Sequence, residues 1–175
     1  MATEPTLPAL SPDEERTWRS LIRLMVILPR AIDEDLSRRG GISLTRYVVL
    51  MRLSEAPGRA LRMSDLAEAA SISPSRMTRI IQPMIAEGLV TRGVVPGDAR
   101  ANLATLTDHG LQRLRDAWPA HLAGARSLVL DHIDPADLPD FHRMTDRLRM
   151  ALESATGDGY APAGPTSDAA GPDGA

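Results

Sequence analysis

Polar and basic side chains gather on one side of the stretch SPSRMTRIIQPMIAEG, which begins at Ser73. Wound as a helix at about 100° per residue, the stretch places its isoleucines and methionines within about 80° of Met77 and its polar side chains opposite. Guanidinium, hydroxyl and amide groups hold phosphates and bond to base edges in the major groove. The polar side carries no acidic residue and supplies candidate nucleic-acid contacts, although any surface helix has a polar side: Ser75, Arg76, Thr78, Arg79 and Gln82.

A second charged feature, Asp98-Ala99-Arg100, follows Pro96-Gly97. Proline followed by glycine predicts a turn, so the acidic and the basic side chain stand at a turn tip. The simplest interpretation is an exposed ion pair that stabilises the turn by less than ~1 kcal/mol.

Other chemistries lack the residues that they need. The chain has no cysteine, which excludes disulfides, thiolate zinc sites, cysteine nucleophiles and thiol-based redox sensing. A zinc site needs three or four converging ligands, and no His-x-x-x-His pair is present. No nucleophile elbow, phosphate-binding glycine loop or HExxH motif occurs either. We therefore predict no enzymatic activity, no cofactor and no metal site, although the chain has four histidines: His109, His121, His132 and His142.

Charge is distributed unevenly along the 175 residues, whose net charge is −3. All 20 basic residues are arginine, a side chain whose planar fork suits phosphate and guanine. Residues 38–115 hold 12 arginines and 6 acidic residues, a net charge of +6, whereas residues 1–37 carry −3 and residues 116–175 carry −6. A basic middle between acidic ends is typical of a domain that meets phosphates with one face.

The elements that must position these side chains begin with a helix over 12–40. Ser11-Pro12 with acidic residues behind it predicts the helix start, Pro29 predicts a kink, and Gly40-Gly41 predicts the end. A second helix is expected over about 44–55. Two short helices, about 64–70 and 74–87, follow with only three residues between them, which is the outline of a helix-turn-helix.

Short alternating segments after these helices predict a β-hairpin over 89–106. Thr107 is expected to cap a helix that runs to about 133, and a last helix should span about 136–153. Residues 1–11 and 154–175 are rich in Pro, Gly, Ala and Ser, which predicts disordered tails. The longest apolar run near the start has five residues, too few to cross a membrane, and no signal peptide is evident, so we expect a cytoplasmic protein.

The stretch LRMSDLAEAASISPSRMTRIIQPMIAEGLVTRGVVPGDARANLATLTDHG resembles the winged helix-turn-helix of the MarR (multiple antibiotic resistance regulator) family. It is similar in its Ser-x-Leu-Ala helix and in its recognition helix, which ends in Glu-Gly-Leu-Val-x-Arg. Its Asp-x-Arg wing leads to Leu-Thr-x-x-Gly, as in that family. The likeness covers about residues 13–153. It implies a mainly α fold with a small β-hairpin wing (α+β), in which helices used for dimerisation flank the winged helix.

The resemblance assigns parts to the segments and to the charged turn. It implies that Arg100 enters the minor groove, whose negative potential attracts a guanidinium, while Asp98 holds it in register. It also implies a homodimer that binds double-stranded DNA at a pseudo-palindromic site. The expected organisation is a MarR-type domain over 12–153, with dimerisation helices over 12–40 and 108–153, a winged helix over 44–107, the helix-turn-helix at about 64–87 and the wing at about 89–106.

The resemblance further implies a regulator, by analogy a repressor, that a small phenolic or anionic ligand releases from DNA. An arginine beside an aromatic ring could hold a carboxylate or phenolate. The simpler interpretation of each residue is that the aromatic side chains belong to the core and the arginines to the surface. The candidate ligand residues are Trp18, Arg46, Tyr47 and Arg52. The alternative function is a winged helix that serves protein–protein contact and no longer binds DNA; that alternative predicts a neutral or acidic recognition face.

Overall fold

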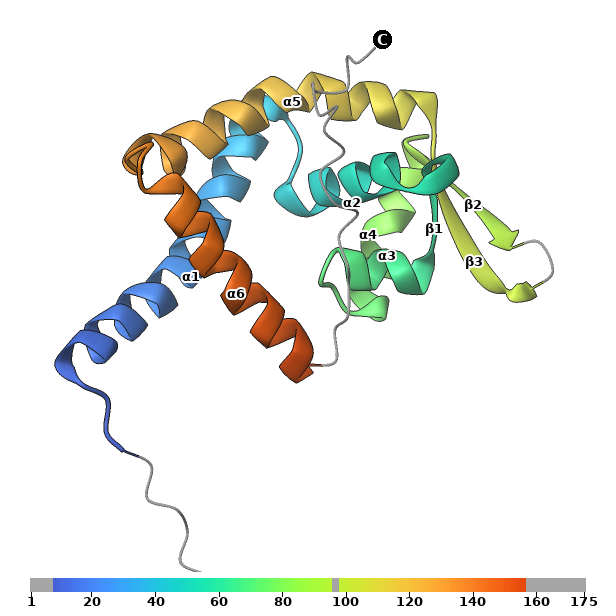
Figure 1. Ribbon diagram of the computed structural model, residues 1–175. Helices are drawn as coiled ribbons and strands as arrows, with labels where there is room; N and C mark the ends of the chain where they lie inside the picture. Colours follow the sequence, from blue (N-terminus) through green and yellow to red (C-terminus); the bar gives the residue numbers. More distant parts are fainter. Residues whose placement is uncertain (1–7, 96–97, 157–175) are drawn as a thin grey trace, which may run out of the picture.

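The computed structural model describes residues 8–95 and 98–156, without the side chains of 94–101 and 156. Most of the two predicted tails, 1–7 and 157–175, lies outside these described residues. The first long helix, α1, spans Pro12–Gly40, and helix α5, which spans Asp108–Leu128, packs against it. Figure 1 shows α5 running from the base of the hairpin across the molecule to α1.

The ends of α1 follow from its sequence. The Ser11 hydroxyl accepts a hydrogen bond from the Glu14 amide and the Glu14 carboxylate accepts one from the Ser11 amide, a reciprocal cap. At the other end Gly41 adopts φ 62°, a left-handed conformation that glycine tolerates best, and its amide donates to the carbonyl of Ser37. The helix continues without interruption through Pro29.

The middle of the chain folds as a compact α+β unit. Its helices are α2 (Leu44–Glu55), α3 (Met63–Ala69) and α4 (Pro74–Ala86), with a 3-10 turn at Pro57–Arg59. Its strands are β1 (Ala60–Arg62), β2 (Val90–Val95) and β3 (Asp98–Leu106), which form an antiparallel sheet in the order β1-β3-β2. The hairpin β2–β3 confirms the predicted wing, and the mainly α fold with a small β wing is as expected.

Strand β1 was not predicted. It has three residues, too few for alternation to be visible, and it forms because Ala60 and Arg62 pair with Thr105 and Leu103 of β3. The pairing joins the chain before the helix-turn-helix to the base of the wing.

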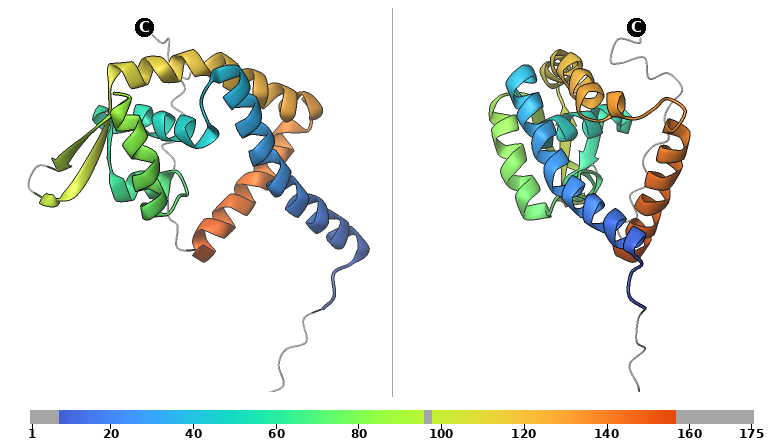
Figure 2. Two further views of the ribbon diagram at one scale, coloured as in Figure 1. Left: turned by 180° about the vertical axis from the view of Figure 1, so that it is seen from behind. Right: turned by 90° about the vertical axis from the view of Figure 1, so that its left-hand side faces the viewer.

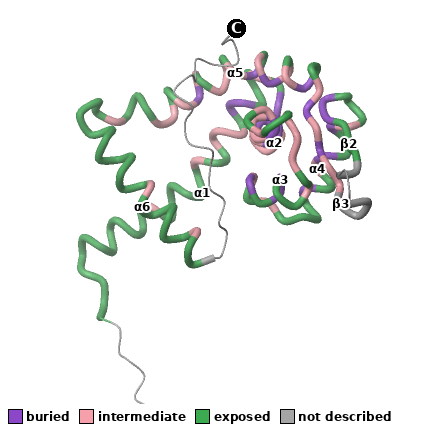
Figure 3. The backbone as a smooth tube through the Cα atoms, turned by 45° about the vertical axis from the view of Figure 1, so that its right-hand side comes forward, coloured by how far each residue is buried: buried purple, intermediate pink, exposed green. Residues whose placement is uncertain are grey.

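One hydrophobic core lies beneath α2, α3 and α4. The aromatic ring of Tyr47 and the side chains of Leu50, Leu53, Leu66, Met77, Ile81 and Met84 are at most 1% exposed. The sheet closes this core with Val90, Ala104 and Leu106, and α5 closes it with Leu114 and Ala117. As Figure 3 shows, buried residues concentrate in this part of the molecule, whereas most of α6 and the first half of α1 are exposed.

The last helix stands apart from the core. Helix α5 ends at Leu128, earlier than predicted, a 3-10 turn spans Leu130–His132, and α6 spans Leu138–Thr156. Helix α6 therefore includes the first residues of the segment expected to be a disordered tail. Among the described elements, α6 packs extensively against none. In Figure 2 the ribbon of α6 crosses that of α1 in the left view and stands apart from it over much of its length in the right view.

Candidate nucleic-acid interface

The sequence of α4 separates its two faces as predicted. Met77, Ile81 and Met84 are fully buried, and Ile80 and Ile85 are partly buried against the same core. The five predicted contact residues all lie on the solvent side and are exposed: Ser75, Arg76, Thr78, Arg79 and Gln82. The helix therefore presents a continuous polar surface without a carboxylate of its own, and the only acidic residue of the stretch 73–88 is Glu87 at its C-cap.

The N-terminus of α4 keeps its backbone donors available. Ser73 is the N-cap residue, yet its hydroxyl makes no capping bond to the helix and lies 3.4 Å from that of Ser75. Thr78 donates to the carbonyl of Pro74. The first turn of a helix carries a partial positive charge, so this end of α4 favours an anion.

Arginines of the winged segment divide into two sets. Three are paired with carboxylates: Arg46 with Glu87, Arg52 with Glu55 and Arg59 with Asp108. Within the described part of the chain, four others have no carboxylate at ion-pair distance: Arg62, Arg76, Arg79 and Arg92. Arg76 and Arg79 lie on α4, Arg62 is the N-cap residue of α3, and Arg92 lies on β2.

Sequence reasoning missed Arg62 and Arg92. Arg92 closes the Glu-Gly-Leu-Val-x-Arg motif, which was not read as a contact, and the only signal for Arg62 was the excess of arginine over acidic residues between positions 38 and 115. Which arginines of that set are paired is decided by contacts between distant segments, and Arg46 with Glu87 is such a contact. The uncompensated charges belong to α4 and to the two elements that flank it along the chain.

The wing extends beyond the helices, with α4 beside it (Figure 1 and Figure 2). Asp98 and Arg100 begin strand β3, and Val95 pairs with Asp98 across the turn after a register irregularity at Val94. The side chains of Asp98 and Arg100 lie outside the described residues, and so does the pairing expected between them.

The four candidate ligand residues do not share one site. Trp18 is 54% exposed and lines a shallow groove formed by residues of α1 alone. The Arg46 guanidinium binds Glu87 and lines a different groove, and the Arg52 Nε donates to the Ala69 carbonyl at 3.1 Å. Tyr47 is buried in the core.

Tyr47 belongs to an aromatic cluster that spacing along the sequence could not reveal. Its ring stacks on His121 of α5 with ring centroids 4.5 Å apart, and Trp118 lies against the same histidine at 5.6 Å. Burial raises the pKa of Tyr47 to about 12, with a smaller contribution from the charge of Glu55, and burial lowers the pKa of His121. The cluster joins α2 to α5 and is a packing contact.

Neither a metal centre nor a membrane span emerges from the described residues. No group of three or more His, Asp or Glu side chains in 8–95 and 98–156 could hold a metal ion. Over the same residues, every helix is too short or too polar to cross a bilayer.

Known proteins are similar to this chain in both sequence and structure. The family model described as MarR family matches residues 40–101. The HTH-type transcriptional repressor Rv2887 of Mycobacterium tuberculosis is 30% identical over 128 residues, which cover 73% of this chain and 89% of the relative. A protein of Mycobacterium bovis, the HTH-type transcriptional repressor Mb2911, matches to the same extent.

Two solved structures from Streptomyces coelicolor are similar over most of their length. The MarR family transcriptional regulator Sco3205, crystallised in complex with DNA, is 31% identical with a TM-score of 0.76, covering 86% of this chain and 92% of its own. The MarR family transcriptional regulator AbsC is 31% identical with a TM-score of 0.76, covering 85% of this chain and 99% of its own. The chain thus belongs to the MarR family, whose members are transcriptional regulators and not enzymes.

Proposed function

We propose that this chain is a sequence-specific DNA-binding repressor that acts as a homodimer on a pseudo-palindromic operator. The observation that carries the proposal is the exposed face of α4, where Arg76 and Arg79 stand without a carboxylate partner among the described residues. An exposed arginine without an ion-pair partner contributes little to folding stability, whereas its planar fork suits a phosphate or a guanine edge. Sco3205, which is similar over most of this chain, was crystallised with DNA, and the mycobacterial relatives are named repressors.

In this proposal α4 enters the major groove. Its N-terminal turns carry Ser75, Arg76 and Arg79, and Pro83 lies further along the same exposed side. Thr78 and Gln82 complete the surface that faces the bases. Because the hairpin extends beyond α4, its tip with Arg100 would reach the neighbouring minor groove, where Asp98 would hold the guanidinium in register.

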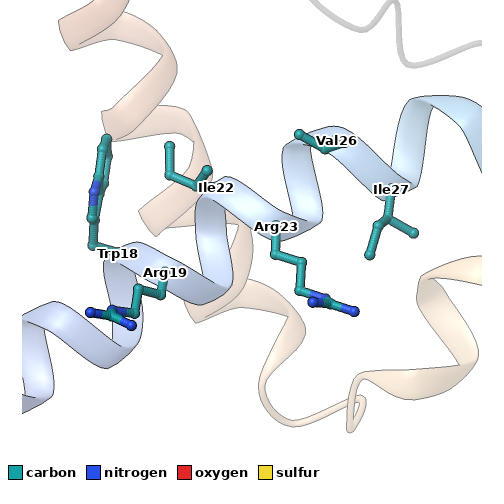
Figure 4. A pocket seen from close by; sticks show the side chains of 6 residues that line it. All are labelled: Trp18, Arg19, Ile22, Arg23, Val26 and Ile27. Atoms are coloured by element: carbon teal, nitrogen blue, oxygen red, sulfur yellow. The ribbon is translucent and has the colours of Figure 1, made fainter.

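Apolar residues left exposed on α1 and α6 support the homodimer. Trp18, Ile22 and Val26 project from one edge of α1, while Arg19 and Arg23 project from another, as Figure 4 shows. On α6 the exposed apolar residues recur at intervals of three or four, as on a helix that packs against another: Leu138, Phe141, Met144, Leu148 and Leu152. A second copy would cover both faces and place two α4 helices in successive major grooves about 10–10.5 bp apart.

The proposed release by a small anion has its best support in a groove beside α4. The groove has a volume of about 390 Å³ and is lined by Arg46, Arg76 and Arg79, together with Ser43, Thr45, Ile80 and Pro83. The Nε of Arg46 is buried there without a hydrogen-bond partner among the described residues. An anion bound between these arginines would compete with DNA phosphates for Arg76 and Arg79, which lowers the affinity for DNA.

Fluorescence anisotropy with DNA from upstream of the protein's own gene tests the proposal. Tight binding that weakens as salt rises, and that prefers this fragment over a scrambled fragment of equal length, is the expected result. Absence of binding to either fragment at low salt would overturn DNA binding and favour the protein-interaction function. Addition of benzoate at constant ionic strength tests the effector groove: release that is lost in Arg46→Ala supports it, and release that persists places the anion elsewhere.

A further inference from the structure

The wing carries a second cation whose position differs from that of its tip. Arg92 on β2 is exposed, and its Nε donates to the Oδ1 of Asn102 on β3 at 3.0 Å. Among the described residues no carboxylate lies at ion-pair distance from Arg92. This hydrogen-bond partner is a neutral amide, so the hydrogen bond orients the guanidinium without cancelling its charge.

The strand register shows which way this pair faces. Arg92 pairs with Ala104, and Val94 pairs with Asn102. Cross-strand partners project from one face of a sheet, and so do residues two apart on a strand. Arg92 and Asn102 therefore share a face with Val90, Ala104 and Leu106, whose side chains are at most 4% exposed in the core. Further along the hairpin, where the core ends, the same face carries Arg92 and Asn102.

The position of Arg92 and Asn102 along the hairpin indicates which part of DNA they would contact. Helix α4 packs against β2, and both views of the ribbon place it beside the wing (Figure 1 and Figure 2). With α4 in the major groove and the tip in the minor groove, the sugar-phosphate strand that separates the two grooves passes between them. Arg92 lies on that part of the hairpin, between its buried base and its tip.

We propose that Arg92 binds a phosphate of the strand between the two grooves and that Asn102 is a positioning residue that aims its guanidinium. The proposal rests on the DNA binding proposed above. With Nε held by the amide, the two terminal nitrogens form the edge that can donate side by side to phosphate oxygens. A contact of this kind fixes where the protein sits on DNA without reading sequence.

The salt dependence of binding tests the proposal on the full-length protein. Each phosphate contact contributes about 0.9 to the slope of log K against log[salt], so two contacts per dimer contribute about 1.8. Between about 50 and 200 mM salt, wild type should therefore lose about twelvefold more affinity than Arg92→Ala. The loss should be equal on the upstream and the scrambled fragment. Arg126→Ala, which removes an exposed arginine at the end of α5, should keep the wild-type slope.

Asn102→Asp separates positioning from folding. It keeps Arg92 but places a carboxylate beside its Nε, so the slope should fall toward that of Arg92→Ala while thermal stability stays at or above that of wild type. An unchanged slope in Arg92→Ala, with wild type binding normally, would overturn this inference alone. Failure of wild type to bind DNA at low salt would overturn the proposed function and this inference with it.

Discussion

At the scale of single residues, Arg79 and Arg76 have equal charge and different expected tasks. Both are exposed on α4, and Arg79 lies about one turn further from the N-terminus of the helix than Arg76. We assign Arg79 to a base, and Arg76 to a phosphate or to a base at the edge of the groove. Arg79→Ala should cost about 1–3 kcal/mol of binding and relax specificity at one position of each half-site. Competition anisotropy with single-base operator variants measures this; an equal loss on every sequence would show that Arg79 contacts phosphate.

A pH effect on folding belongs to the same scale. Burial against Tyr47 lowers the pKa of His121 below its ordinary value of 6.5. Above that pH the histidine is neutral in both states. As pH falls below about 6.5 the unfolded chain binds the proton first, so stability falls until the pH reaches the lower folded pKa. Urea unfolding at several pH values should show this loss reduced in His121→Gln and retained in His109→Gln; an identical pH profile for all three proteins would contradict the role of His121.

At the scale of elements, the link between the wing and α5 depends on one glycine. A Cβ on Gly110 would lie 2.1 Å from the carbonyl oxygen of Leu89 and 2.7 Å from the side chain of Leu106, so only glycine lets α5 start this close to the hairpin. Gly110→Ala should therefore destabilise the fold by at least the ~1–3 kcal/mol typical of overpacking. Gly93→Ala is the matched control, since a Cβ there meets nothing within 4 Å. Thermal unfolding followed by circular dichroism compares the two, and equal melting temperatures would refute the close contact.

Helix boundaries could be predicted where a local sequence signal marks the start or the end of the helix. Ser11, Ser43 and Thr107 cap their helices with side-chain hydrogen bonds, and Gly41 ends α1, because these residue types favour such positions whatever surrounds them. Strand β1 was missed because only its partner on β3 makes it a strand. The polar face of α4 followed from helical period alone. The contacts of Arg46 with Glu87, Arg92 with Asn102 and Tyr47 with His121 join separate elements, and only the folded chain reveals them.

At the scale of the whole molecule, charge and apolar surface occupy different ends. The winged segment holds Arg62, Arg76, Arg79 and Arg92, which have no carboxylate at ion-pair distance among the described residues. Helices α1 and α6 instead hold large apolar side chains that the other described residues leave exposed. Phe141 is 38% exposed and Leu148 is 50% exposed, a pattern that costs solubility in a lone subunit. In the homodimer proposed above, association through the helical end would leave the basic end available to DNA.

Dimerisation and DNA binding should consequently fail together when the helical end is altered. Leu148→Glu places a charge in the centre of the exposed stripe on α6, and burial of an unpaired charge in an interface is costly. Sedimentation velocity should show a shift from dimer to monomer at micromolar concentration, with circular dichroism unchanged because α6 packs extensively on no other described element. Ala86→Glu, at an exposed position at the end of α4, should sediment as wild type.

Because one protomer engages only one half-site, the Leu148→Glu protein should also lose its preference for the operator over other DNA. A Leu148→Glu protein that stays dimeric would place the interface on α1 or on another surface, whereas a monomer that still binds the full operator as wild type does would separate DNA recognition from dimerisation.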